Sequence, residues 1–228
     1  MQTSVRGLTA VMAGMVVLFG TACQSMGNRE RGAVIGAATG AAAGAVIGKA
    51  TGSTARGAIV GAAVGGAAGA IIGHQMDQQA KEIDENVPGA TVTRVGEGLV
   101  VTFESGLMFD FDSDRLRAEA MRNLDNLAAN FDKFGQSNLL LVGHTDAQGA
   151  DAYNLDLSRR RAEAVSNYLA TKGIARSRMS VVGRGETEPI ATNETEAGKQ
   201  ENRRVEIAVY ASDAMKRDAQ SRVPPPQR

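Results

Sequence analysis

A glycine at every fourth position is the feature that most constrains this chain. The period occurs twice, between Gly32 and Gly52 and between Gly57 and Gly73. The second stretch repeats the first, because Arg31-Gly-Ala-Val-Ile-Gly-Ala-Ala aligns with Arg56-Gly-Ala-Ile-Val-Gly-Ala-Ala. Four-residue spacing places the glycines on one helix face, where a second helix can approach closely. The duplication therefore predicts a glycine-zipper helical hairpin over residues 31–74.

The sequence allows three environments for this hairpin. Neither Gly32–Gly48 nor Gly57–Gly73 contains a charged residue. Each stretch would measure about 25 Å as a helix, the short limit for crossing a hydrocarbon core of about 30 Å. In water each glycine would destabilise a helix by about 1 kcal/mol relative to alanine. A membrane-inserted hairpin, a zipper that forms a homo-oligomer, and a flexible linker are the alternatives, and the duplication argues against the linker.

The first residues have the layout of a signal peptide. Arg6 precedes an uncharged, largely apolar run from Leu8 to Phe19, and small residues lead into Cys23. Cys23 is the only cysteine, which excludes an internal disulfide. An ordinary secretory signal with a chance cysteine is the alternative to a functional role for this thiol.

Small residues directly before a cysteine resemble the lipobox of bacterial lipoproteins, although Gly20 stands where that family usually has leucine. The resemblance implies a signal peptide over residues 1–22, a covalent lipid such as palmitate on Cys23, and a tether over residues 23–30. Gln24 then implies delivery to the outer membrane, facing the periplasm, with the inner membrane as the alternative. No other cofactor is expected, and membrane lipid is an expected partner.

Charge argues against nucleic acid as a partner. The 25 basic and 25 acidic residues cancel, so there is no overall positive charge to displace phosphate counterions. The 228 residues suffice for one compact domain of about 100 to 150 residues and an accessory region. Because the composition changes after His74, we expect the compact domain to follow the glycine-rich stretch.

The remaining pattern predicts alternating strands and helices. Residues 75–90 are polar and predict a helical linker, and residues 212–228 predict a disordered tail. Ser113 is the expected N-cap of one amphipathic helix, and Gly173 is expected to end a second. The expected strands are Thr91–Val95, Leu99–Phe103, Leu139–Val142, Met179–Val182 and Val205–Tyr210. This order predicts an α/β (α+β) two-layer sandwich, with both helices on one face of a mixed sheet.

Five short motifs then follow one another along this region. They are Phe109-Asp110-Phe111-Asp112-Ser113, Gly143-His144-Thr145-Asp146, the segment from Asn154 to Arg161-Ala162, Gly183-Arg184-Gly185-Glu186, and Asn202-Arg203-Arg204-Val205-Glu206. In this order they resemble the OmpA-like peptidoglycan-binding family. The resemblance implies a β-β-α-β-α-β-β domain over residues 91–211. The lipidated start and the glycine zipper together resemble the small glycine-zipper lipoproteins of that family.

The resemblance also implies a function, which is non-covalent binding of the diaminopimelate residue of peptidoglycan. Diaminopimelate presents an ammonium beside a carboxylate, so its site needs an anion close to a cation. Asp146 and Arg161 match the family's paired ligand positions, and a guanidinium can donate two hydrogen bonds to a carboxylate. A purely structural salt bridge is the alternative for this pair.

Further residues match the family's secondary contacts. Asn154, Arg203 and Thr145 are the expected ones, and a structural arginine paired with a neighbouring acid is the alternative for Arg203. His144 is expected to be a hydrogen-bonded structural residue and not a metal ligand. Asp110 and Asp112 are expected to cap a helix together with Ser113.

An enzyme is disfavoured by the sequence. The chain has two histidines, its one cysteine is assigned to the signal, and no serine lies in the setting of a nucleophile. The second hypothesis is a membrane-inserting or oligomerising factor, built from the zipper and anchored to the wall. The first remains a lipoprotein that tethers a membrane to peptidoglycan.

Overall fold

The computed structural model of the protein describes residues 52–110 and 112–224. The predicted signal peptide, the lipid on Cys23 and the first glycine repeat lie outside these residues. The second glycine repeat and the whole predicted binding domain lie within them.

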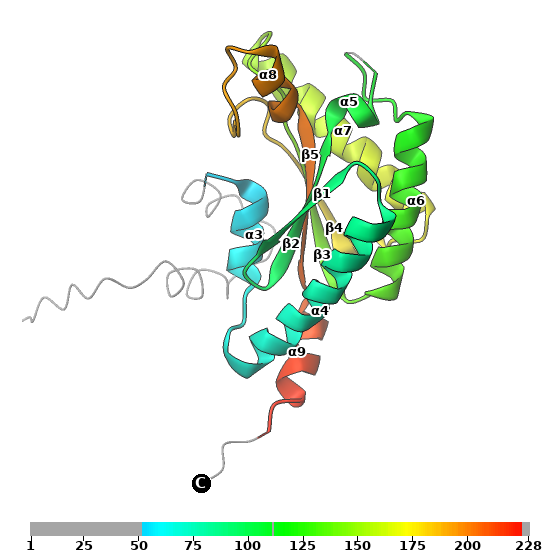
Figure 1. The fold of residues 1–228 in the computed structure, drawn as a ribbon, viewed down its shortest axis with the longest axis vertical. Coiled ribbons are helices and arrows are strands. Elements are labelled where there is room, and N and C mark those ends of the chain that lie inside the picture. The colour runs from blue at the N-terminus through cyan, green and yellow to red at the C-terminus, as the bar shows by residue number, and fades with distance from the viewer. Residues whose placement is uncertain (1–51, 111, 225–228) are drawn as a thin grey trace, which may run out of the picture.

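A five-stranded mixed sheet forms the centre of the domain (Figure 1). Its order is β1-β2-β5-β3-β4, with β3 and β4 parallel and every other neighbouring pair antiparallel. The strands are β1 (Ala90–Val95), β2 (Gly98–Glu104), β3 (Ser137–Gly143), β4 (Met179–Gly183) and β5 (Arg204–Ala211). All five predicted strands are confirmed, each within two residues of its expected bounds.

The central strands are buried on both faces. In β5, Val205, Ile207 and Val209 belong to the larger hydrophobic cluster, whereas Ala208 and Tyr210 belong to a smaller cluster on the opposite face. This alternation is the two-residue period of a strand. Because both faces are covered, β3 has an uninterrupted apolar run instead of alternating with polar residues.

The two predicted helices lie on the face of the larger cluster. They are α6 (Ala118–Lys133) and α7 (Asp151–Thr171), and Gly173, with a φ of 94°, follows the end of α7 as expected. The prediction that Ser113 caps the first helix is wrong, because α6 begins only at Ala118. Ser113 Oγ instead accepts a hydrogen bond from Arg115 N at 3.0 Å.

The residues before α6 take a different path from the one expected. They form a short helix, α5 (Ser105–Met108), and an isolated antiparallel bridge between Phe109 and Leu116. This bridge holds Leu116, which fits the helical period, outside the helix. The residues between the bridge and α6 contact α7, where Arg161 Nε donates to Ser113 O and Arg160 pairs with Asp114.

The second glycine repeat does not form one continuous helix. It divides into α3 (Thr54–Ala62) and the beginning of α4 (Gly66–Asn86). Gly65 and Gly66 have φ of 74° and 62°, a conformation that glycine adopts without strain. The Glu97 carboxylate stabilises this break by accepting hydrogen bonds from Val64 N at 2.8 Å and Gly65 N at 2.6 Å.

Helix α3 covers the face of the sheet that the prediction left open. Its Ala55, Ala58 and Ile59 pack in the smaller cluster with residues of the central strands. At its beginning, Thr54 N donates to the Glu188 carboxylate at 3.0 Å. The α/β fold and the predicted order of elements are confirmed, but the expected two layers become three because α3 adds a layer.

Both expected boundaries of the domain also differ from the structure. The predicted linker is part of α4, where Met76, Gln79 and Ile83 are buried against the domain. The prediction of a disordered tail is wrong for α9 (Asp213–Ser221), whose Met215 and Ala219 pack in the larger cluster. Neither helix is strongly apolar, and each is stabilised mainly by its tertiary contacts.

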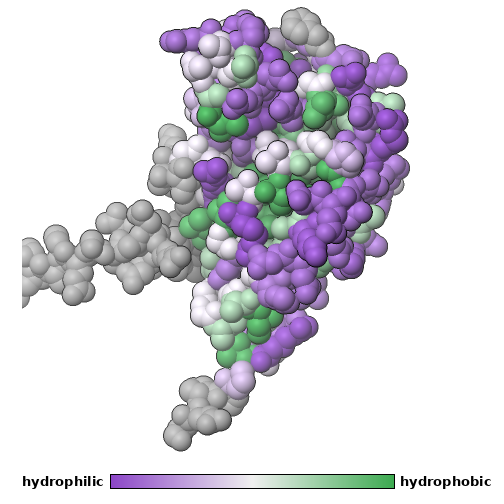
Figure 2. Space-filling model, viewed as in Figure 1, coloured by the Kyte–Doolittle hydropathy of each residue, from purple (hydrophilic) through white to green (hydrophobic). Residues whose placement is uncertain are grey.

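Hydrophilic and hydrophobic residues are unevenly distributed over the surface of the domain. Figure 2 shows hydrophilic residues over the outer side of α6, and hydrophobic surface toward the end of the molecule where α4 begins. Among the described residues, no helix combines the length and the apolar character that a membrane crossing requires.

Candidate functional site

The five predicted ligand residues line one cavity. It has a volume of about 530 Å³ and lies beyond the carboxyl end of β3, between α5, the start of α7 and the loop before α6. The residues are Thr145, Asp146, Asn154, Arg161 and Arg203. The volume is within the range of small-molecule sites, about 300 to 1,000 Å³. The sequence therefore selected residues that the fold brings together, although their positions span 59 residues of chain.

Asp146 is the predicted anion that lines this cavity. It lies three residues beyond the end of β3, and only 8% of its side chain is exposed. Its Oδ1 accepts a hydrogen bond from Gln148 N at 3.1 Å, and its Oδ2 forms an ion pair with Arg203 Nη1. The alternative considered for Arg203, pairing with an acid, is thus what the structure shows. Arg203 directly precedes β5, so this pair links the loop after β3 to the neighbouring strand.

Arg161 is the second cation of the cavity and has a different environment. Its Nε donates to Ser113 O at 2.9 Å, and its guanidinium lies over the Phe109 ring, 5.3 Å from the centroid. Arg161 is 5% exposed, yet it forms no ion pair with a carboxylate in the described part of the chain. Burial lowers the pKa of this guanidinium, with the charges of Tyr153 and Asp112 opposing the shift. A structural salt bridge between Asp146 and Arg161 is therefore not what the structure shows.

Asn154 and Thr145 shape the loop that carries Asp146. The Nδ2 of Asn154 donates to Asp146 O at 3.3 Å, to Gln148 O at 3.1 Å and to the Glu186 carboxylate at 2.6 Å. This amide therefore holds the loop against the segment after β4. Thr145 N donates to Gly185 O at 2.9 Å, while its buried Oγ1 has no hydrogen-bond partner among the described residues.

Several residues of the cavity were not predicted as ligands. Tyr153 Oη donates to the Asp112 carboxylate across the opening, and Ser105 Oγ is buried without a hydrogen-bond partner in the described residues. Asp110 and Asp112 line the cavity and do not cap a helix, and Asp112 has a φ of 53°. No local pattern could have revealed these positions, because they depend on the path of the loop before α6.

A buried charged cluster lies beside the site. Arg204 Nε and the Glu206 carboxylate form an ion pair at 2.8 Å, and His144 Nε2 lies 3.8 Å from the other Glu206 oxygen. The expected hydrogen bonds of His144 are not present, because neither ring nitrogen has a partner among the described residues. Burial, reinforced by Arg204 and Arg184, holds the pKa of His144 well below its usual 6.5. The ring is therefore neutral, and its contact with Glu206 is not an ion pair.

This neutral histidine predicts that stability falls in mild acid. In the unfolded chain His144 binds a proton below about pH 6.5, whereas the folded protein resists that protonation. The free energy of unfolding should therefore fall as the pH drops below 6.5, by up to about 1.4 kcal/mol per pH unit from this group. His144→Leu should flatten the slope, measured by urea unfolding between pH 7.5 and 5. His74→Ala, at the exposed second histidine, should retain the wild-type slope, and equal slopes for both variants would contradict the assignment.

Comparison with known proteins agrees with this architecture. Residues 108–203 match the model of the OmpA family, and residues 1–77 match a YMGG-like Gly-zipper model. The probable lipoprotein YiaD of Escherichia coli is 34% identical over 138 residues, which are 60% of this chain and 63% of that protein. A peptidoglycan-associated lipoprotein of Brucella melitensis is 31% identical over 51% of this chain and 69% of its own length.

A solved structure shares both sequence and fold. The cell wall anchor of the T6SS from Pseudomonas aeruginosa is 32% identical, with a TM-score of 0.53, over 60% of this chain and 97% of that one. The chain spans less than two thirds of the length of several curated relatives that it matches, YiaD included. The order of strands, the residues of the cavity and these similarities together show that the chain belongs to the OmpA family.

Proposed function

We propose that the domain binds the diaminopimelate residue of peptidoglycan non-covalently and thereby tethers a membrane to the cell wall. The observation that carries this proposal is a buried guanidinium, Arg161, that lines the cavity and forms no ion pair with any carboxylate of the described residues. A buried charge without a counter-ion is costly, and a ligand carboxylate would provide one. Proteins with similar sequences are named as peptidoglycan-associated lipoproteins, which supports the same ligand.

In this proposal the ligand's two charges are read by different residues. Arg161 has its Nε bonded to Ser113 O, so its two Nη groups are free to donate to the carboxylate of diaminopimelate. Asp146 accepts from the ammonium beside that carboxylate. Arg203 orients the Asp146 carboxylate through their ion pair, and Asn154 positions the loop, so both act mainly through Asp146. The unpartnered Thr145 hydroxyl is available for a further hydrogen bond.

We further propose binding without catalysis. The described residues that line the cavity include neither histidine nor cysteine, and their amides, charges and hydroxyls suit the recognition of a zwitterion. A lipid on Cys23 and a position on the outer membrane, facing the periplasm, complete the proposed tether. The names of YiaD and of the peptidoglycan-associated relatives, which call them lipoproteins, support this part.

A comparison of diaminopimelate with a blocked lysine tests the ligand. Nα-Acetyl-lysine amide has the side-chain ammonium of diaminopimelate, but its α groups are blocked and no carboxylate lies beside the ammonium. In an NMR titration, diaminopimelate should shift the Arg161 Nε–H and the amides around Asp146. Nα-Acetyl-lysine amide should bind at least about tenfold more weakly, because it forms no charge-assisted hydrogen bonds with Arg161. Equal affinity for the two compounds would overturn the assignment.

A further inference from the structure

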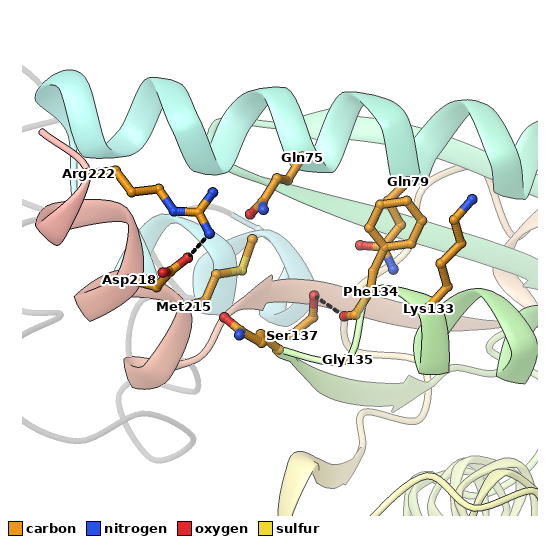
Figure 3. Close-up of a pocket in the computed structure, with 10 residues that line it drawn as sticks. Gln75, Gln79, Lys133, Phe134, Gly135, Ser137, Met215, Asp218 and Arg222 are labelled. Atoms are coloured by element: carbon orange, nitrogen blue, oxygen red, sulfur yellow. Dashed lines mark hydrogen bonds and ion pairs between the residues drawn. The ribbon is translucent and has the colours of Figure 1, made fainter.

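A second pocket lies at the opposite end of β3 from the proposed diaminopimelate site. It has a volume of about 370 Å³ and opens between α4, α9 and the turn that joins α6 to β3 (Figure 3). Ser137, the first residue of β3, lines it, whereas Asp146 follows the last. A seven-residue strand separates the two sites by about 20 Å. Helices α4 and α9 lie wholly outside residues 108–203, so only the side of the pocket formed by residues 133–137 belongs to the family's matched segment.

Three carboxamide side chains and three charged side chains form most of the polar lining of this pocket. Gln75 and Gln79 are four residues apart and extend from the same side of α4 toward the pocket in Figure 3, and Gln136 lies in the turn. Gln79 is 1% exposed and donates to Asn130 Oδ1 at 2.9 Å. Its Oε1 accepts no hydrogen bond from the described residues and can accept one from a ligand. A carboxamide provides both donors and acceptors, which matches a ligand that provides both.

An aromatic ring and a thioether form the apolar side. Phe134 is partly exposed, and it belongs to neither hydrophobic cluster of the domain although it follows directly after α6. Met215 reaches the pocket from α9. The chain has only nine aromatic residues, six Phe and three Tyr. Because aromatic rings are this scarce, a ring outside the core is a candidate contact surface.

The charges at the rim are already paired. Arg222 forms an ion pair with Asp218 at 2.7 Å, drawn in Figure 3, and Lys133 pairs with Glu82. No other charged residue lines the pocket in the described part of the chain. A charged ligand would have to compete with these pairs, so the lining favours an uncharged polar molecule.

The position of the pocket also disfavours an extended peptide. Peptides commonly bind by adding a strand to a free sheet edge. β3 is paired on both sides, with β5 and β4, so no free edge opens here. A compact ligand with hydroxyl and amide groups fits this enclosure better than an extended chain.

We propose that this pocket binds a neutral acetamido sugar. The ligand's amide exchanges hydrogen bonds with Gln75 and Gln79, its ring hydroxyls reach Gln136, and its apolar face and methyl group pack on Phe134 and Met215. The site does not use Asp146 or Arg161. It therefore provides a contact with glycan that is separate from the proposed contact with the stem peptide.

The full-length protein in detergent micelles tests this with N,N′-diacetylchitobiose as the probe. In a ¹H–¹⁵N titration, the side-chain amide signals of Gln75 and Gln79 should shift and saturate. Gln75→Ala and Phe134→Ala should each weaken binding by roughly three- to tenfold, the effect of losing one neutral contact. Circular dichroism should show that both variants stay folded, because both side chains are partly exposed.

Matched controls separate the outcomes. Gln78→Ala changes an exposed glutamine of the same helix that contacts His74, and it should leave binding unchanged. Asp146→Ala should also leave it unchanged, so failure of the proposed diaminopimelate site would not affect this result. The absence of saturable shifts, an equal loss in Gln78→Ala, or tighter binding of N-acetylalanine amide than of the sugar would each overturn the proposal.

Discussion

Replacing Arg161 with alanine is expected to abolish retention of the protein on purified peptidoglycan sacculi. In the free protein this guanidinium is buried and has no carboxylate partner in the described residues, so the proposed ligand provides its counter-ion. Removing one member of a buried, hydrogen-bonded charge pair weakens binding by about 2 to 5 kcal/mol, which is at least about 30-fold. A sacculus pull-down with quantified bound and free fractions measures this loss.

The neighbouring residue provides a matched control. Arg160 lies on the same helix but pairs with Asp114 at 3.1 Å and with Asp156, outside the cavity. Arg160→Ala should therefore retain wild-type binding. Arg161→Lys keeps the charge but loses the planar fork, so it should restore binding only in part. Equal retention of the Arg160→Ala and Arg161→Ala proteins would show that Arg161 does not hold the ligand.

Asp146 should show the same loss for a different reason. Asp146→Ala removes the acceptor for the ligand's ammonium and also leaves Arg203 without its ion pair. The unpaired Arg203 would then lie where the ligand's ammonium binds and would repel it. Together, the two substitutions distinguish a site that reads both charges from one that reads a carboxylate alone.

Gly143→Ala is expected to destabilise the whole domain. A Cβ at Gly143 would lie 2.0 Å from the carbonyl oxygen of Ser158, which belongs to the backbone of α7. Backbone cannot rotate away as a flexible side chain can, so α7 and β3 would have to separate. Overpacking of a core costs about 1 to 3 kcal/mol and occasionally more, and we expect the upper end, about 3 kcal/mol. Urea unfolding monitored by circular dichroism measures the change.

A second glycine shows whether the effect comes from contact. A Cβ at Gly106 would meet nothing within 4 Å, and Gly106 has no positive φ. Gly106→Ala should therefore leave the free energy of unfolding nearly unchanged. If both substitutions had the same small effect, the close approach of α7 to β3 would not be a determinant of stability. In the sequence Gly143 is only the first residue of a short motif, whereas in the structure it lets helix α7 pack closely on strand β3.

The residues of the site could be predicted from sequence motifs, but their contacts could not. Asp146 and Arg161 could be selected because their motifs resemble those of a family, and all five selected residues line one cavity. Pairing with an acid was the alternative predicted for Arg203, but neither Asp146 as its partner nor the unpaired state of Arg161 could be predicted. Both depend on where the loop after β3 lies relative to the start of β5, which are distant in the chain.

The sequence by itself determined the strands, the two long helices of the domain and their order, because two-residue and 3.6-residue periods are local properties. Only the tertiary structure decided the conformation of the segments that flank the domain, which form α3 and α9. The glycine period of the α3 residues predicted a zipper with another helix. In the structure α3 packs instead on an apolar face of the sheet, a partner that no local pattern reveals. The charged tail becomes α9 for the same reason, since burial against α4 and the sheet stabilises a helix that would be marginal alone.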